Sequence, residues 1–488
     1  MNYIEFPLKR IPQLKFLYYG GVNRILFHSK DLWYIDIPKE FRNWIQVSQK
    51  EGEKGSYMVK VMVNDFDGDH LREGYLLLSC WDEKFCIPVI QYPEYVPIID
   101  SVFRDYLISN FDKEHDGRLS QKKANQITTL GYNCELKGIK SFSGIEYMPN
   151  LKYLKYNGCE VLYLDLSHNT ILEYLDCSNN SFEDLDVSNN TALKYLFCSG
   201  NSLSNLDVSN NTVLEQLDCS RNSLKDLDVS NNAALKHLYC SRNSLSNLDV
   251  SNNTVLEELD CSRNSLKDLD VSNNTDLKYL YCSGISLSDL DVSKNTILEQ
   301  LDCSSNYNLK DLDISNNAAL KYLCCSGNSL RKLDVSNNTA LEQFNCSTNS
   351  LKDLDVSNNT ALKYLYCSNN SLRKLDVSNN AALERLNCSN NSLRNLDVRD
   401  NTNLEILDCS SNFLKDLDVR NNTALKELNC SNNALSDLDV NKNTDLKELN
   451  ISRNLLTDID LSNNVNLENI LYEMNNIRNL DLSNNKLL

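Results

Sequence analysis

The stretch LKYLFCSGNSLSNLDVSNNTV, from Leu193 to Val213, is one copy of a 21-residue sequence that repeats from Leu151 to the C-terminus. We number the positions of each copy from one, at Leu193, to 21. Position six marks sixteen copies, and the step between copies is 21 residues except from Cys303 to Cys325, where one residue is inserted. A copy this short cannot bury its apolar residues alone, so stacked copies must share one core. The chain is therefore mostly a solenoid, in which each copy forms one coil.

Leucine, cysteine and asparagine alternate with variable residues in the first half of each copy, in the pattern L-x-x-L-x-C-S-x-N-x-L. We expect the leucines and the cysteine to point inward, and the asparagine at position nine to bond backbone groups where the chain turns. Only Cys159 and Ile285 interrupt the asparagines. Parallel side chains on neighbouring strands stay farther apart than a disulfide prefers, so buried free thiols are expected at position six.

This pattern resembles the leucine-rich repeat family, whose consensus L-x-x-L-x-L-x-x-[N/C]-x-L it meets over some 340 residues, with Cys at the sixth position. The resemblance implies a mainly β, right-handed solenoid of about sixteen coils, over residues 149–488. We place the concave strands in the first half, because its outward positions vary between copies. About ten residues remain for the return path, too few for a helix of average length. Short extended or 3₁₀ segments are expected there, without regular convex helices.

Residues 1–96 contain short alternating apolar runs separated by turn signals, such as Trp33–Ile37 and Tyr57–Val63, a pattern typical of a small β-sandwich. The order of a Gly-Gly turn, Trp33, Trp44 and the later runs resembles the BACON domain, an immunoglobulin-like module common in surface proteins of Bacteroidetes. We expect both tryptophans in the core. Cys80 and Cys86 flank a predicted hairpin, where a cross-strand disulfide is an open alternative.

Residues 97–148 are predicted to form a linker and two helices, Phe103–Asn110 and Gln121–Leu130, that cap the solenoid. The loop between them resembles the calcium loop of the EF-hand and dockerin families. Its candidate ligands are Asp112, Glu114, Asp116 and Ser120. The last ligand position, normally a bidentate Glu, holds Lys123, which opposes calcium. We therefore expect no cofactor, with a functional calcium site as the alternative.

The composition excludes some classes of partner. A net charge of −18 argues against nucleic acid, which attracts clustered Lys and Arg. No run of eighteen apolar residues exists, so no transmembrane segment is predicted. The first residues lack the basic and apolar parts of a secretory signal. We expect a protein of the cell surface or a secreted one, with its export signal missing from this chain; retention inside the cell is the alternative.

The outward positions two, three and five of the concave strands are the candidate binding surface. Coils with aromatic and basic residues alternate with acidic coils, and the aromatic residues thin out beyond Arg385. Aromatic rings flanked by hydrogen-bonding groups suit a protein or a sugar ligand, expected on the first two thirds. The competing interpretation is duplication of a two-coil block, with Lys and Glu paired between coils. The candidates are Tyr195, Phe197, Asp218, His237, Tyr239, Glu258, Asp260, Tyr279, Tyr281, Asp302, Tyr322, Tyr364 and Tyr366.

Catalysis has little support in the sequence. The five histidines are scattered, and a flat strand ladder offers no pocket to separate the pKa values of two carboxyl groups. The aspartates at position fifteen, Asp165 to Asp481, are expected to accept hydrogen bonds within their own turns instead of holding metal. We predict a non-enzymatic protein that binds a host- or matrix-derived protein or glycan through the concave face at a bacterial surface. The alternative is a spacer that presents the β-sandwich as the binding module.

Overall fold

The computed structural model describes residues 3–7, 11–68, 70–112, 115–131, 138–159 and 161–488. The chain forms two compact parts, Met1–Ala192 and Leu193–Leu488. The fold is mainly β, as expected, and the described residues contain two α-helices.

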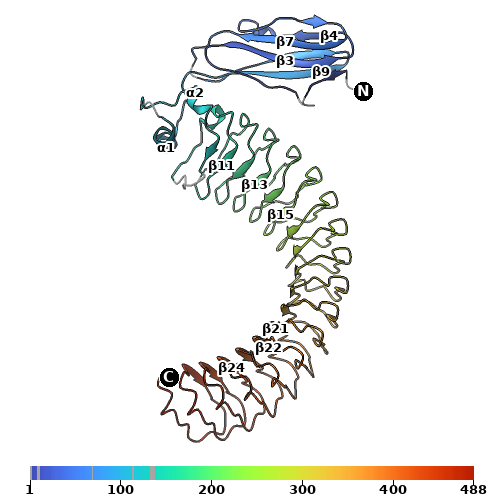
Figure 1. Ribbon diagram of the computed structural model, residues 1–488, viewed down its shortest axis with the longest axis vertical. Coiled ribbons are helices and arrows are strands. Elements are labelled where there is room, and N and C mark those ends of the chain that lie inside the picture. The colour runs from blue at the N-terminus through green and yellow to red at the C-terminus, as the bar shows by residue number, and fades with distance from the viewer. Residues whose placement is uncertain (1–2, 8–10, 69, 113–114, 132–137, 160) are drawn as a thin grey trace. The chain divides into compact units, whose positions relative to one another are not determined.

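Two β-sheets open the N-terminal part (Figure 1). Their inward residues form one core, in which Trp33 and Trp44 are buried as predicted. The first sheet has the order β1 (Ile4–Glu5), β3 (Gly21–Ser29), β7 (Gly55–Val63), β5 (Ile45–Val47), and the second β2 (Leu14–Phe16), β9 (Glu83–Gln91), β8 (Arg72–Cys80), β4 (Trp33–Asp36), β6 (Glu51–Gly52). Alternation of buried and exposed residues along the strands explains why these segments pair into two layers.

The predicted hairpin is β8 and β9, but its two cysteines are not bonded to each other. In the antiparallel register Cys80 faces Glu83, and Cys86 faces Leu77. Cys80 is buried, whereas Cys86 is exposed. The disulfide alternative is therefore wrong, because the two residues are not cross-strand partners.

The first predicted helix is α1 (Ser101–Phe111), whose first turn is capped by Asp100 through the N–H of Phe103 at 2.9 Å. The second helix is shorter than predicted: α2 spans Gln121–Ala124. Thr129–Leu130 instead forms β10, which pairs in parallel with β11 (Tyr153–Lys155). The carbonyl of Thr128 accepts hydrogen bonds from the N–H groups of Lys152 and Tyr153, so pairing with the first coil competes successfully with helix extension. The 3₁₀ segments are η1 (Lys39–Phe41) and η2 (Ile145–Tyr147).

One short strand per coil, in the first half of each copy as predicted, forms the parallel sheet of the solenoid. In Leu193–Leu488 the strands line the inner side of a curved array (Figure 1). The return path consists of turns and irregular segments, without a helix among the described residues. The strands are β11, β12 (Tyr174–Asp176), β13 (Tyr195–Phe197), β14 (Gln216–Asp218), β15 (His237–Tyr239), β16 (Glu258–Asp260), β17 (Tyr279–Tyr281), β18 (Gln300–Asp302), β19 (Tyr322–Cys324), β20 (Gln343–Asn345), β21 (Tyr364–Tyr366), β22 (Arg385–Asn387), β23 (Ile406–Asp408), β24 (Glu427–Asn429), β25 (Glu448–Asn450) and β26 (Asn469–Leu471).

The position-six cysteines, from Cys177 to Cys430, form a fully buried column of free thiols, as predicted. They pack with the leucines of positions one, four and eleven, which are also buried. Burial raises the pKa of the Cys367 and Cys430 thiols from 9.0 to about 12. These thiols act as small apolar side chains of the core.

The asparagines of position nine bridge consecutive coils as expected. Asn222 donates through Nδ2 to the carbonyls of Cys198 and Cys219, both at 3.0 Å, and its Oδ1 accepts the N–H of Leu203 at 3.0 Å. Where Ile285 replaces Asn, its own N–H is bound by Oδ1 of Asn306. The side chains thus satisfy backbone groups that the turn leaves without partners.

A second asparagine ladder, at position nineteen, was not recognised as such in the sequence. Asn232 is fully buried, and its Nδ2 donates to the carbonyls of Val208 at 3.0 Å and Asn211 at 2.9 Å in the preceding coil. Equivalent residues recur in every copy from Asn169 to Asn485. Each coil therefore has two corners, the turns at positions nine and nineteen, and asparagine side chains hydrogen-bond it to the preceding coil at both.

Removing one asparagine side chain of the position-nineteen ladder should destabilise the solenoid. In Asn274→Ala the buried carbonyls of Val250 and Asn253 lose their donor, so we expect about 2–5 kcal/mol of lost stability. The neighbouring Asn273→Ala removes an exposed amide and should change stability by less than about 0.5 kcal/mol. Urea denaturation compares the variants, and hydrogen exchange locates the weakened coils. Equal losses in both variants would contradict the assigned role.

The buried thiols should be unreactive in the folded protein. With Cys134, which lies outside the described residues, changed to Ser, we expect DTNB at pH 8 to modify only Cys86 readily, and all seventeen remaining thiols after denaturation. Because folding raises the thiol pKa, the ladder's contribution to stability is complete below about pH 9 and is lost as pH rises toward 12. Rapid modification of several thiols in the folded state would contradict the ladder.

Candidate functional site

The thirteen candidate residues all lie on strands β13 to β19 and β21, on the inner side of the array. Positions three and five are half-buried, and the leucine between them is buried. We call the surface formed by positions two, three and five of the coils that contain β13 to β26 the concave face. The structure places the predicted residues on one surface, in columns that run across the strands.

Lysine and glutamate at position two pair between neighbouring coils, as the duplication interpretation expected. The Nζ–Oε2 distance is 2.9 Å for Lys236 and Glu215, and 2.7 Å for Lys278 and Glu257. Hydrogen bonding to Glu215 raises the pKa of Lys236. The other pairs in this part are Lys321–Glu299, Lys363–Glu342, Lys426–Glu405 and Lys447–Glu468. Most charged side chains at position two are therefore already paired with each other within the molecule.

Tyrosine hydroxyls of the concave face bond to the next coil. Tyr239 donates to Glu258 at 2.7 Å, Tyr281 donates to Gln300 at 2.8 Å, and Tyr364 donates to Glu384 at 3.0 Å. Burial and the hydrogen bond to Glu258 raise the pKa of the Tyr239 hydroxyl. These bonds fix the orientation of the three rings within the molecule.

The position-five aspartates have a local role. One oxygen of Asp218, Asp260 and Asp302 accepts the N–H of the serine two residues later, at 3.0, 3.0 and 2.9 Å. These carboxylates close the turn that follows each strand. Nδ1 of His237 lies 3.6 Å from Oε2 of Glu258, so this carboxylate contacts both His237 and Tyr239 of the preceding coil.

A hollow of about 360 Å³ lies on the concave face beyond Tyr366. Position five holds Asn387, Asp408 and Asn429 there, whereas Tyr239, Tyr281 and Tyr366 occupy this position in three earlier coils. Arg385, Ile406 and Glu427 also line it. A ligand was expected on the first two thirds because of their aromatic residues; this hollow lies in the last third.

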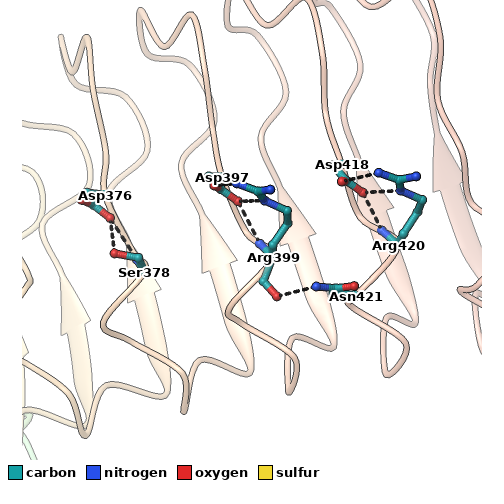
Figure 2. A network of polar contacts seen from close by, with 7 residues as sticks. All are labelled: Asp376, Ser378, Asp397, Arg399, Asp418, Arg420 and Asn421. Atoms are coloured by element: carbon teal, nitrogen blue, oxygen red, sulfur yellow. Dashed lines mark hydrogen bonds and ion pairs between the residues drawn. The ribbon is translucent and has the colours of Figure 1, made fainter.

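The position-fifteen aspartates, Asp165 to Asp481, act within their own turns, as expected. Figure 2 shows three of them, and Oδ1 of Asp376 accepts both the N–H and the hydroxyl of Ser378. In two coils arginine replaces serine: Arg399 and Arg420 each bind their aspartate with two guanidinium N–H groups. Arg420 lowers the pKa of Asp418 to about 2. No group of three potential metal ligands occurs among the described residues.

The calcium-like loop holds a lysine ammonium on its acidic ligands. Nζ of Lys123 lies 2.7 Å from Oδ1 of Asp112, 3.5 Å from Oδ1 of Asp116 and 3.5 Å from the carbonyl of Arg118. Lys123 lowers the pKa of Asp112. Ser120 caps α2 through the N–H of Lys123, and Glu114 lies outside the described residues. This arrangement does not fit calcium, because a positive charge already occupies the carboxylates.

No protein-family model and no curated protein matches the sequence. Among solved structures, the functional domain of InlJ from Listeria monocytogenes, described as including a cysteine ladder, shares 36% identity over 72% of each chain, with a TM-score of 0.62. The chain belongs to the leucine-rich repeat family. The leucine-rich effector YopM from Yersinia pestis is similar at 23% identity, covering 78% of this chain and 95% of YopM, with a TM-score of 0.48.

This leucine-rich repeat protein carries the cysteine column at the place of the consensus leucine. Within the described residues no helix is long and apolar enough to cross a membrane. The variability of positions two, three and five predicted the concave residues, but the sequence analysis did not predict the hollow.

Exchange of one residue should turn the calcium-like loop into a calcium-binding site. Lys123→Glu removes the ammonium and supplies the last carboxylate, so we expect calcium binding with a Kd of roughly 10⁻⁴ M and a calcium-dependent rise in Tm. The native protein should show neither effect, and Lys122→Glu, an exposed neighbour with the same charge change, is the matched control. Titration calorimetry and melting curves in calcium or EDTA provide the measurement. Calcium stabilisation of the native protein would contradict this account.

Proposed function

We propose that this leucine-rich repeat protein is a non-enzymatic binding protein that recognises a protein or glycan, host- or matrix-derived, through its concave face at a bacterial cell surface. The observation that carries the proposal is the set of half-buried aromatic side chains whose hydroxyls are held by the next coil, as for Tyr239 and Tyr281. Aromatic rings of this kind dominate binding energy in protein interfaces.

The charge arrangement of the concave face supports this proposal. Six Lys–Glu pairs satisfy position two internally, so binding there would break existing contacts. The neighbouring columns at positions three and five retain aromatic area and hydrogen-bonding groups. A ligand that covers these columns buries apolar surface without displacing the ion pairs.

A second candidate function places binding on the N-terminal sheets, with the solenoid as spacer. Trp81, at the turn between β8 and β9, is 68% exposed and stacks on Tyr3 with ring centroids 6.3 Å apart. The N–H of Leu32 and the Trp81 side chain lower the pKa of Asp31. An exposed ring beside a carboxylate suits a sugar or an aromatic partner.

The proposal also assigns an identity and boundaries to each domain. The N-terminal sheets represent a BACON-like domain of a Bacteroidetes surface protein, and residues 97–148 represent a cap derived from an EF-hand or dockerin loop. The domains then span residues 1–96, 97–148 and 149–488. No cofactor is required, since Lys123 supplies the charge of the loop.

Binding should depend on the concave tyrosines. We expect the double variant Tyr239→Ser/Tyr281→Ser to lose about tenfold or more in affinity for any ligand found on glycan and matrix-protein arrays, because interface aromatics carry much of the binding energy. Tyr307→Ser is the matched control: Tyr307 is 72% exposed and lies outside the concave face. Biolayer interferometry measures the affinities.

Trp81→Ser tests the second candidate in the same assay. Loss of binding in this variant, with unchanged affinity in the concave variant, would contradict the concave-face proposal and favour the spacer function. Absence of any ligand on both arrays would also count against it. Circular dichroism of each variant verifies that the solenoid is intact.

A further inference from the structure

A groove outside the concave face concentrates positive charge in an acidic protein. It encloses about 980 Å³ over the return paths of consecutive coils. Its exposed cations are Arg373, Lys374 and Arg394, and Phe413 borders it. We call this surface the flank groove. It goes beyond the proposed function, because it shares no residue with the concave face.

The three cations of the flank groove form no ion pair within the described part of the chain. This contrasts with position two of the concave face, where the Lys–Glu pairs form between coils. Neighbouring like charges repel, so such an arrangement is not stabilised by internal partners. Arg373, Lys374 and Arg394 therefore remain available for an external anion.

The two carboxylates of the groove are already bound. Asp376 accepts two hydrogen bonds from Ser378, and Asp397 receives two guanidinium N–H groups of Arg399, at 3.0 and 2.7 Å (Figure 2). Most copies carry Ser where Arg399 stands, so the carboxylate of Asp397 is neutralised by a change at this place. Neutralising one acid leaves the neighbouring cations with excess positive potential.

Phe413 adds an apolar contact to the same groove. Most copies carry Ser at this position, including Ser371 and Ser392. The N–H of Phe413 donates to the carbonyl of Leu393 at 2.8 Å, as the N–H of Ser392 does to Leu372, so the backbone contact does not require the ring. Phe413 is nevertheless 61% exposed. The phenyl ring offers area to a partner that also contacts the cations.

We propose that the flank groove binds an acidic protein segment with spaced carboxylates and an apolar side chain that covers Phe413. Two arginines favour planar carboxylates, which they bind in bidentate fashion. A dense polyanion such as a sulfated polysaccharide fits less well, because the carboxylate of Asp376, which is bound by Ser378 and not by a cation, lines the same groove and repels its anionic groups. Spaced carboxylates avoid this position.

The test uses an array of 12-residue peptides that permute Asp, Glu, Phe, Leu and Ser, followed by fluorescence anisotropy with the best binder. We expect Arg373→Glu/Arg394→Glu to weaken binding about tenfold or more, and Phe413→Ser to weaken it several-fold. Lys225→Glu/Lys267→Glu is the matched control, with the same exposed position twelve and the same charge change in other coils. It should leave affinity within about twofold.

Three outcomes would overturn the proposal. One is that no acidic peptide binds the native protein, and another is that both charge-reversed variants lose affinity equally. The third is that a sulfated polysaccharide binds through Arg373 and Arg394 more tightly than any peptide. The concave variant Tyr239→Ser/Tyr281→Ser should retain peptide binding, so failure of the concave-face function and failure of this site are distinguishable.

Discussion

Satisfying buried backbone carbonyls at the two corners of each coil is the constraint on which the solenoid depends. A 21-residue coil has no room for a helix on its return path, so its backbone groups must bond to the neighbouring coils or to side chains. Asparagine Nδ2 reaches carbonyls of its own and of the preceding coil at one corner, as for Asn222, and of the preceding coil at the other, as for Asn232. Leucine and cysteine side chains then fill the interior, and they add no buried groups that need strong hydrogen-bond partners.

The single insertion shows how this constraint operates. Asn306 still donates to the carbonyls of Cys282 and Cys303, at 3.0 and 2.9 Å, and Leu309 is still fully buried. The additional residue is accommodated between these two, where Tyr307 is 72% exposed. The additional residue of this coil thus lies outside the positions that connect it to its neighbours.

The repeat made the strands, the thiol column and the first asparagine ladder predictable, because identical positions must have the same environment in every coil. Features that occur once were less predictable. Helix α2 ended early because the Thr129–Leu130 strand found a partner in the first coil, and Cys80 and Cys86 stayed apart because the register pairs them with other residues. The concave candidates were predicted from variable positions, whereas the hollow and the flank groove, bordered by Asn387 and Phe413 respectively, were not predicted.

The turn aspartates explain how Arg can replace Ser two residues later without loss of the turn hydrogen bond. A turn needs an acceptor at position fifteen, and Asp397 supplies it to the N–H of Arg399 as Asp376 does to that of Ser378. An adjacent cation leaves this hydrogen bond in place. Replacement of Ser by Arg therefore preserves the local hydrogen bond and balances the negative charge of the aspartate, as Arg420 does for Asp418 in the next coil. The backbone ladders remain unchanged, so the outward charge of each coil can vary independently of the stability of the stack.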